Sequence, residues 1–267
     1  MDGALWYNNF KMTIRKEEII YSGGKRGYPS KQAQTVCDIF CYEPENIEQS
    51  PLGNLYIVCQ LSCVKDCLHL NNLLALLIKR EYYSRPAKEA FKSFQAALKK
   101  ANSHLNDLAK QGSLEWLGKT HFICAAIAGK NLFLAQAGEP LAVLWRQGKT
   151  ANLSRKIIPE NQKPDPRKFF SNVVCGKIEE EDKMILATPF INQLVNETGL
   201  KQIFANRFNI ADIADQINKI LREQKKPSPI AVLLLEAAAE PPLKEKSFLP
   251  KPSRVITPPI DLGEILK

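Results

Sequence analysis

Three cysteines and a histidine form the first cluster in this sequence with the composition of a metal site. Cys59, Cys63 and Cys67 recur every four residues, and His69 follows closely. Thiolates and imidazoles are the ligands that zinc and iron–sulfur clusters take in proteins. Paired zinc ligands usually have two residues between them, whereas three stand here, and Cys59 ends a predicted strand. Small buried side chains are therefore favoured over a metal site.

Nucleophilic and phosphate-binding patterns are the next candidates. Cys63 and His121 offer a thiol–imidazole pair, but no third group that would orient the imidazole is signalled. The glycine-rich turn at 22–29 carries Lys25 and Arg26 and has the composition of a phosphate cradle, yet a surface loop is favoured. The sequence contains no P-loop and no dinucleotide fingerprint. We therefore assign no catalytic, cofactor-binding or metal-ligating residue from these patterns.

The composition is that of an ordinary globular chain. Its 267 residues are 45% hydrophobic and 24% charged, with a net charge of +9. This charge favours anionic partners in general, but it is not gathered in one dense run, so no nucleic-acid ligand is expected. Seven cysteines, an odd number, argue against a disulfide framework and favour the cytoplasm. The sequence shows no signal peptide and no apolar run of membrane-spanning length, so no membrane association is expected.

Hydrophobic periodicity predicts strands alternating with pairs of helices, an α+β pattern. The strands are predicted at 13–21, 34–42, 55–60, 121–128, 131–137, 141–146, 183–188 and 230–235. The helices are predicted at 67–83, 87–110, 191–195 and 210–221. The segment 146–168 is rich in basic residues and prolines, which indicates an irregular connection; a solvated loop is favoured there over a site for an acidic partner.

The segment 118–148 contains three short predicted strands separated by turns. Gly118-Lys119-Thr120 opens the first strand, the turn Gly138-Glu139-Pro140-Leu141 precedes the third, and Leu144-Trp145-Arg146-Gln147-Gly148 closes it. This arrangement resembles the core of the PPM family, the metal-dependent Ser/Thr protein phosphatases of type 2C, in which a Gly-Asp-Ser-Arg turn occupies the same place. The resemblance covers residues 20–236. It implies a four-layer α/β/β/α sandwich of two antiparallel sheets flanked by helices.

The resemblance also implies where metal ligands should fall. In that family Asp and Glu side chains hold two Mg or Mn ions, which activate a water molecule for attack on phosphorus. The family's Asp-Gly pair falls on Gln60-Leu61, its Ser/Thr-Asp-Gly element on Thr188-Pro189-Phe190, and its Asp-Asn element on Ser228-Pro229. Its first acidic position falls near 31–34, which holds no acid, and only Glu139 keeps an acid near a family position. One misaligned motif is plausible but four are not, so the resemblance implies the fold without its two-metal site.

Three functional hypotheses remain open. The favoured one is a catalytically inactive PPM-like domain, a pseudophosphatase with a binding or regulatory role, a protein partner and no cofactor. The second is an active, divergent Ser/Thr protein phosphatase that hydrolyses phosphomonoesters with Mg or Mn at a relocated site drawing on Glu139, Asp182 or Asp38. The third is a different α+β sandwich, an amidohydrolase of N-terminal-nucleophile type, although the sequence marks no processed nucleophile. A metal-dependent activity separates the first two.

The domain organisation follows from a change in composition after residue 240. Residues 1–240 are expected to form the PPM-type phosphatase-like domain. Residues 241–267 carry six prolines and several basic residues, and are expected to form an extended, basic tail. A disordered end is favoured over a segment that docks into a partner's groove. The sequence leaves the oligomeric state open.

Overall fold

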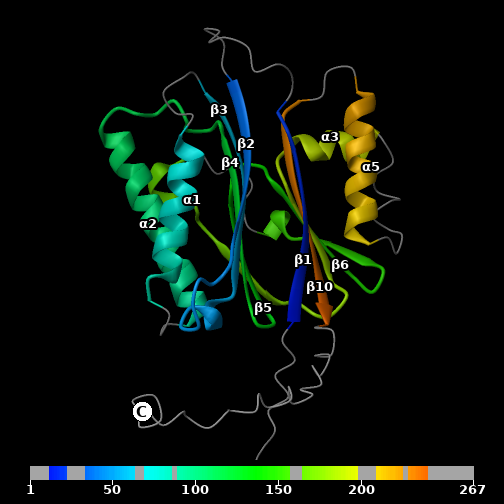
Figure 1. The fold of residues 1–267 in the computed structure, drawn as a ribbon. Coiled ribbons are helices and arrows are strands. Elements are labelled where there is room, and N and C mark those ends of the chain that lie inside the picture. The colour runs from blue at the N-terminus through cyan, green and yellow to red at the C-terminus, as the bar shows by residue number, and fades with distance from the viewer. Residues whose placement is uncertain are drawn as a thin grey trace, which may run out of the picture.

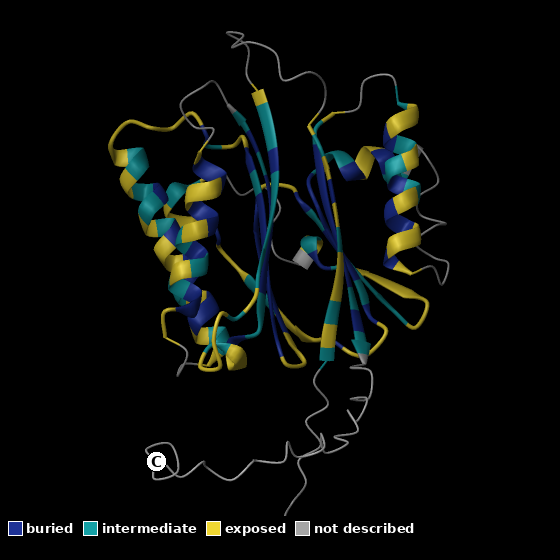
Figure 2. Ribbon diagram, in the orientation of Figure 1, coloured by how far each residue is buried: buried dark blue, intermediate teal, exposed yellow. Residues whose placement is uncertain are grey.

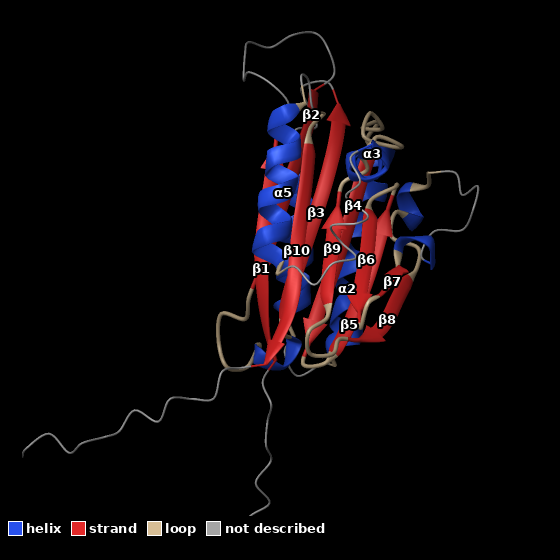
Figure 3. Cartoon of the chain, turned by 90° about the vertical axis from the view of Figure 1, so that its right-hand side faces the viewer, coloured by secondary structure: helices blue, strands red, loops and turns tan. Residues whose placement is uncertain are grey.

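Two five-stranded antiparallel sheets pack face to face in this protein (Figure 1). The computed structural model describes residues 12–22, 34–63, 69–85, 89–156, 164–197, 209–224 and 228–239. Sheet A has the spatial order β1 (Met12–Tyr21), β10 (Ile230–Ala239), β9 (Lys183–Ala187), β6 (Leu141–Arg146) and β7 (Lys149–Asn152), which Figure 3 shows face-on. Sheet B has the order β2 (Gln34–Tyr42), β3 (Asn54–Cys63), β4 (Thr120–Ala128), β5 (Asn131–Ala137) and β8 (Val173–Lys177).

Helices cover the outer face of each sheet. The pair α1 (Leu70–Tyr83) and α2 (Ala90–Lys110) lies on sheet B, and α3 (Phe190–Glu197) and α5 (Ile210–Glu223) lie on sheet A (Figure 1). Short 3-10 helices occur at Ser50–Leu52, Ser154–Lys156 and Pro166–Lys168. The predicted four-layer α/β/β/α sandwich is confirmed. No helix among the described residues is long and apolar enough to cross a membrane.

Three apolar clusters fill the three interfaces between these layers, which appear as buried segments in Figure 2. Alternation along β4 shows how one strand serves two of them. Phe122 and Cys124 belong to the cluster beneath α1 and α2, whereas Ile123 and Ala125 belong to the cluster between the sheets. Because both faces of β4 are covered, the strand is apolar at nearly every position rather than at every second one.

Helix α5 shows why the local sequence forms the element it does. Asn209 precedes the helix, and its side-chain Oδ1 accepts a hydrogen bond of 2.8 Å from the backbone N–H of Asp212. This cap satisfies one of the free N–H groups of the first turn. Ile213 and Ile217, four residues apart, are then buried against sheet A. A local signal and an apolar stripe therefore agree on the same helix.

Two strands were missed in the sequence, and two predicted strands, β3 and β10, are longer; β10 continues to Ala239 instead of ending at Leu235. The segment 146–168, predicted to be irregular, contains β7, and β8 follows it without having been predicted. β3 continues to Cys63 instead of ending at Gln60. On α2, His104 has a buried Nε2 with no hydrogen-bond partner among the described residues. The tail at 241–267 lies outside the described residues.

Candidate functional site

The candidate site is the end of the sandwich at which β2 begins, β3 ends, β4 begins and β9 ends; we call it the site end. Strand register brings its residues together. Gln60 on β3 is paired with Cys37 on β2 and with His121 on β4. Thr188, which follows β9 in the opposite sheet, lies within hydrogen-bonding reach of the Cys37 thiol. The site end therefore spans both sheets, as a site between two layers must.

Gln60 and Cys37 form a neutral pair where the family resemblance implies a metal-binding aspartate. The Cys37 thiol donates to Gln60 Oε1 over 3.7 Å. Burial, followed by the negative charge of Asp38, raises the pKa of the Cys37 thiol to about 12. Cys37 is therefore an uncharged thiol at neutral pH rather than an activated thiolate nucleophile. The carboxamide of Gln60 supplies no negative charge.

Leu61 explains why β3 is longer than predicted. This leucine stands where the resemblance implies a glycine, and its side chain is fully buried in the cluster beneath α1 and α2. A buried branched side chain favours the continued strand, which a glycine would interrupt. The ladder accordingly continues through the pairs Gln60–His121 and Leu61–Thr120. Gln60 is thus held inside a strand rather than placed in a turn after it.

Thr188-Pro189 joins two strands and starts a helix. The fully buried Thr188 accepts a hydrogen bond of 3.0 Å at Oγ1 from the backbone N–H of Ala231, and its own N–H donates to the Ala231 carbonyl over 3.0 Å. Pro189 directly precedes α3, a position where its fixed φ suits the start of a helix. Its side chain has no donor atom for a metal. Thr188 thus links the end of β9 to β10, and Pro189 offers no metal ligand.

His121 packs against the turn that contains Glu139. The backbone N–H of Glu139 donates to His121 Nδ1 over 3.0 Å, so the neutral imidazole carries its proton on Nε2. Burial lowers the pKa of His121, while the Glu139 carboxylate acts in the opposite direction. Gly138, which precedes Glu139, has φ +70°, and a Cβ built there would lie 2.6 Å from His121 Nδ1. Glu139 is the one candidate acid that lies at the site end.

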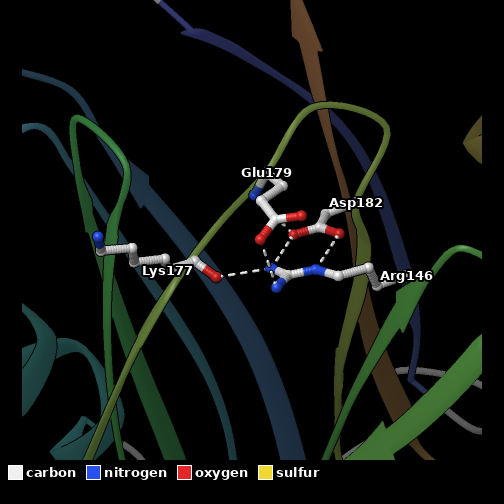
Figure 4. A network of polar contacts seen from close by, with 4 residues as sticks. All are labelled: Arg146, Lys177, Glu179 and Asp182. Carbon is white, nitrogen blue, oxygen red and sulfur yellow. Dashed lines mark hydrogen bonds and ion pairs between the residues drawn. The ribbon is translucent and has the colours of Figure 1, made fainter.

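Asp182, a second candidate acid, forms an ion pair with Arg146 (Figure 4). The pair lies where β9 begins, at the end of the sandwich opposite the site end. Arg146 donates from Nε to Asp182 Oδ1 over 2.9 Å and from Nη2 to Oδ2 over 2.6 Å. The same guanidinium reaches Glu179 Oε1 at 2.9 Å and the Lys177 carbonyl at 2.7 Å. Asp182 precedes β9 and Thr188 follows it, which separates them by about 20 Å of extended chain. Asp182 is therefore not a ligand at the site end.

Asp38, the third candidate acid, faces away from the space between the sheets. Its Oδ2 accepts a hydrogen bond of 2.8 Å from Asn71 Nδ2 on α1. Successive strand residues point to opposite faces, so Cys37 faces sheet A and Asp38 faces the helices. Among the described residues, no group of three or more His, Cys, Asp or Glu side chains is arranged to hold a metal ion. The described residues at the site end therefore do not fit a site for two divalent cations.

The cysteine cluster is placed only in part. Cys59 is fully buried beneath the helices, and its Sγ donates to the backbone carbonyl of Asp38 over 3.8 Å. Burial raises the pKa of the Cys59 thiol. The Cys63 side chain, Cys67, most of the glycine-rich turn at 22–29 and residues 31–33 lie outside the described part of the chain, so the Cys63–His121 pair is untested.

Comparisons with known proteins agree on the architecture. No protein-family model matches the chain, and no curated protein matches it. Among solved structures, the catalytic domain of the serine/threonine protein phosphatase PstP with two manganese ions has a TM-score of 0.56 at 13% identity, covering 85% of this chain and 99% of that one. The fold is that of the PPM-type phosphatases.

Two further structures with the PPM fold support this assignment. The PP2C phosphatase domain of SpoIIE from Bacillus subtilis, with a fragment of its regulatory domain, has a TM-score of 0.61 at 13% identity, covering 87% of this chain and 64% of that one. A serine/threonine phosphatase from S. agalactiae has a TM-score of 0.56 at 13% identity, covering 84% and 99%. At identities this low, structural likeness shows the PPM fold and nothing beyond it. The TM-scores and coverages favour this fold over that of the third hypothesis, an amidohydrolase of N-terminal-nucleophile type.

The sequence identified Gln60 and Pro189 at the site end, but it missed one residue there and one ion pair at the opposite end. Cys37 was not singled out, and neither was Arg146 as the partner of Asp182. The alternation in the strand 34–42 assigns Cys37 to one face, but only the register with β3 brings it opposite Gln60. The pairing of Arg146 with Asp182 joins residues 36 positions apart, which no local pattern signals.

Proposed function

We propose that this chain is a PPM-type phosphatase-like domain that does not catalyse phosphoester hydrolysis, a pseudophosphatase with a binding or regulatory role. The observation that carries the proposal is that Gln60 and Pro189 stand where the resemblance implies metal-binding aspartates, and both are neutral. Mg and Mn are hard cations that take charged oxygen ligands, and two of them held close together need several carboxylates. A carboxamide at Gln60 and a proline at 189 supply none of that charge.

The separation of the three candidate acids supports the same proposal. A relocated metal site needs at least two carboxylates within a few ångströms of one another. Glu139 lies at the site end, Asp182 is ion-paired to Arg146 at the other end, and Asp38 contacts α1. No described group draws these acids together, which weighs against the alternative of an active divergent phosphatase.

A cytoplasmic setting and a protein partner complete the proposal. The described cysteines Cys37, Cys41, Cys59, Cys124 and Cys175 are all free thiols, which suits a reducing compartment. A domain without chemistry of its own acts through what it binds, and an excess of basic residues favours an acidic protein surface. We propose a protein, rather than a nucleic acid or a membrane, as that partner.

The test is hydrolysis of p-nitrophenyl phosphate by the purified full chain, with millimolar MnCl2 in one arm and EDTA in the other. We expect no turnover above the buffer blank in either arm. Turnover that requires manganese and disappears in EDTA would contradict the proposal and establish the active-phosphatase alternative. In that case Glu139→Gln and Asp38→Asn, measured side by side, identify which acid serves the site.

A further inference from the structure

A groove of about 370 Å³ lies on the outside of the sandwich, between α2 and the segment that leads into β8. One wall is the exposed side of α2, which contributes Gln95, Lys99 and Asn106. The other wall is the segment 167–173, which leads from the 3-10 helix at Pro166–Lys168 into β8. None of the site-end residues lines this groove, so its role is separate from theirs.

The two walls are fixed to each other by a paired hydrogen bond. Asn102 on α2 donates from Nδ2 to the Phe170 carbonyl over 2.9 Å, and its Oδ1 accepts from the Phe170 N–H over 2.9 Å. The Phe170 ring is buried and packs edge-on against Phe122, with centroids 5.7 Å apart. The groove is therefore formed before any ligand arrives, and binding does not have to order its walls.

The lining of the groove is basic and offers hydrogen-bond donors. Two cations, Lys99 and Arg167, face it, and no Asp or Glu is among its lining residues. Asp165 orients the Arg167 guanidinium through Nε at 3.2 Å and Nη2 at 3.1 Å, while Nη1 has no partner among the described residues. Arg167 is thus ion-paired to Asp165, whereas Lys99 forms no ion pair within the described part of the chain. Side-chain amides of Gln95 and Asn106 add neutral donors and acceptors.

We propose that this groove binds an acidic, extended segment of a protein partner. Carboxylates of the segment pair with Lys99 and Arg167, and the amides along α2 hydrogen-bond to its backbone. The proposal rests on the binding role proposed above and gives it a surface and a partner chemistry. One of the two cations of the groove, Arg167, comes from the connection between β7 and β8.

The experiment measures fluorescence anisotropy of a labelled Asp/Glu-rich peptide titrated with the full chain, with a Ser/Gly peptide of equal length as the neutral probe. The test variants are Lys99→Glu and Arg167→Glu. The matched control is Lys100→Glu, which makes the same charge change at the next, equally exposed position of α2 but outside the groove. We expect Lys99→Glu and Arg167→Glu each to weaken binding about tenfold, and Lys100→Glu to change it less than about twofold.

Three outcomes overturn the inference. They are no preference for the acidic peptide over the neutral one, equal losses in all three variants, which would reflect net charge alone, and a preference for single-stranded RNA over the peptide. Circular dichroism of each variant checks that the fold is intact. The phosphatase assay keeps the two proposals apart. Manganese-dependent turnover contradicts the pseudophosphatase proposal and says nothing of the groove, whereas failure of the wild-type chain to prefer the acidic peptide contradicts the groove proposal and says nothing of catalysis.

Discussion

At the scale of single residues, His121 is the titrating group of the site end. Its Nδ1 accepts the Glu139 N–H, an arrangement that only the form with an unprotonated Nδ1 allows. Burial is the main cause that lowers its pKa below the ordinary 6.5. Protonation of His121 therefore opposes the hydrogen bond and the folded state together.

This lowered pKa predicts a pH dependence of stability. Below about pH 6.5 the unfolded chain binds a proton at His121 that the folded chain resists, so the free energy of unfolding falls with decreasing pH down to the folded pKa. Urea unfolding at about pH 7.5 and about pH 5.5 should show a smaller loss for His121→Gln than for the wild type. His69→Gln serves as the control. Equal pH dependence in His121→Gln and the wild type would falsify the assignment.

At the scale of elements, the turn between β5 and β6 packs directly against the start of β4. Gly138 has φ +70°, and a Cβ there would meet both His121 Nδ1 and the Thr120 carbonyl at 2.6 Å. Gly148, in the turn after β6, has φ +75°, but a Cβ there would meet nothing within 4 Å. The two glycines share a backbone conformation and differ only in their neighbours.

Alanine substitutions at these two turns should therefore separate strain from steric clash. Gly148→Ala forces an alanine into a left-handed backbone conformation without any steric clash, and it should lower the free energy of unfolding by about 1 kcal/mol. Gly138→Ala adds a clash with backbone and should lower it by about 3 kcal/mol or more. Chemical denaturation of both variants measures the difference. Similar losses would show that the contact with β4 relaxes freely.

At the scale of the whole molecule, the Arg146 network connects the two sheets at the end opposite the site end. Arg146 ends β6 in sheet A, and it reaches the carbonyl of Lys177, which ends β8 in sheet B. The Asp182 side chain in this network is 2% exposed and that of Arg146 is 31% exposed. The network thus supplements the apolar cluster between the sheets with a partly buried ionic link.

Neutralising this link should loosen the assembly of the sheets. Asp182→Asn leaves Arg146 without its bidentate partner, and we expect a loss of about 2 kcal/mol, reduced from the fully buried case because Arg146 is partly solvated. Glu89→Gln is the control, since the Glu89–Lys92 pair is well exposed and should contribute less than about 0.5 kcal/mol. Thermal unfolding of both variants gives the comparison, and equal midpoints would refute a structural role for the network.

Much of the fold was predictable because its elements carry local signals. The amphipathic helix α2 and the strand at 34–42 both appear as predicted, within a few residues. β7 and β8 lacked such signals. β7 is four residues long, and β8 contains Gly176, so their strand conformation comes from pairing with β6 and β5.

The sequence by itself determined that the positions of Gln60 and Pro189 are neutral, because residue identity settles which charges and ligand atoms a side chain can offer. The tertiary structure alone decided where the remaining acids lie. Asp38 turns toward α1 because strand neighbours face opposite sides, and Asp182 lies a strand's length from Thr188. Both facts depend on register and on the packing of one sheet against the other, which bring together or separate residues regardless of their distance along the chain.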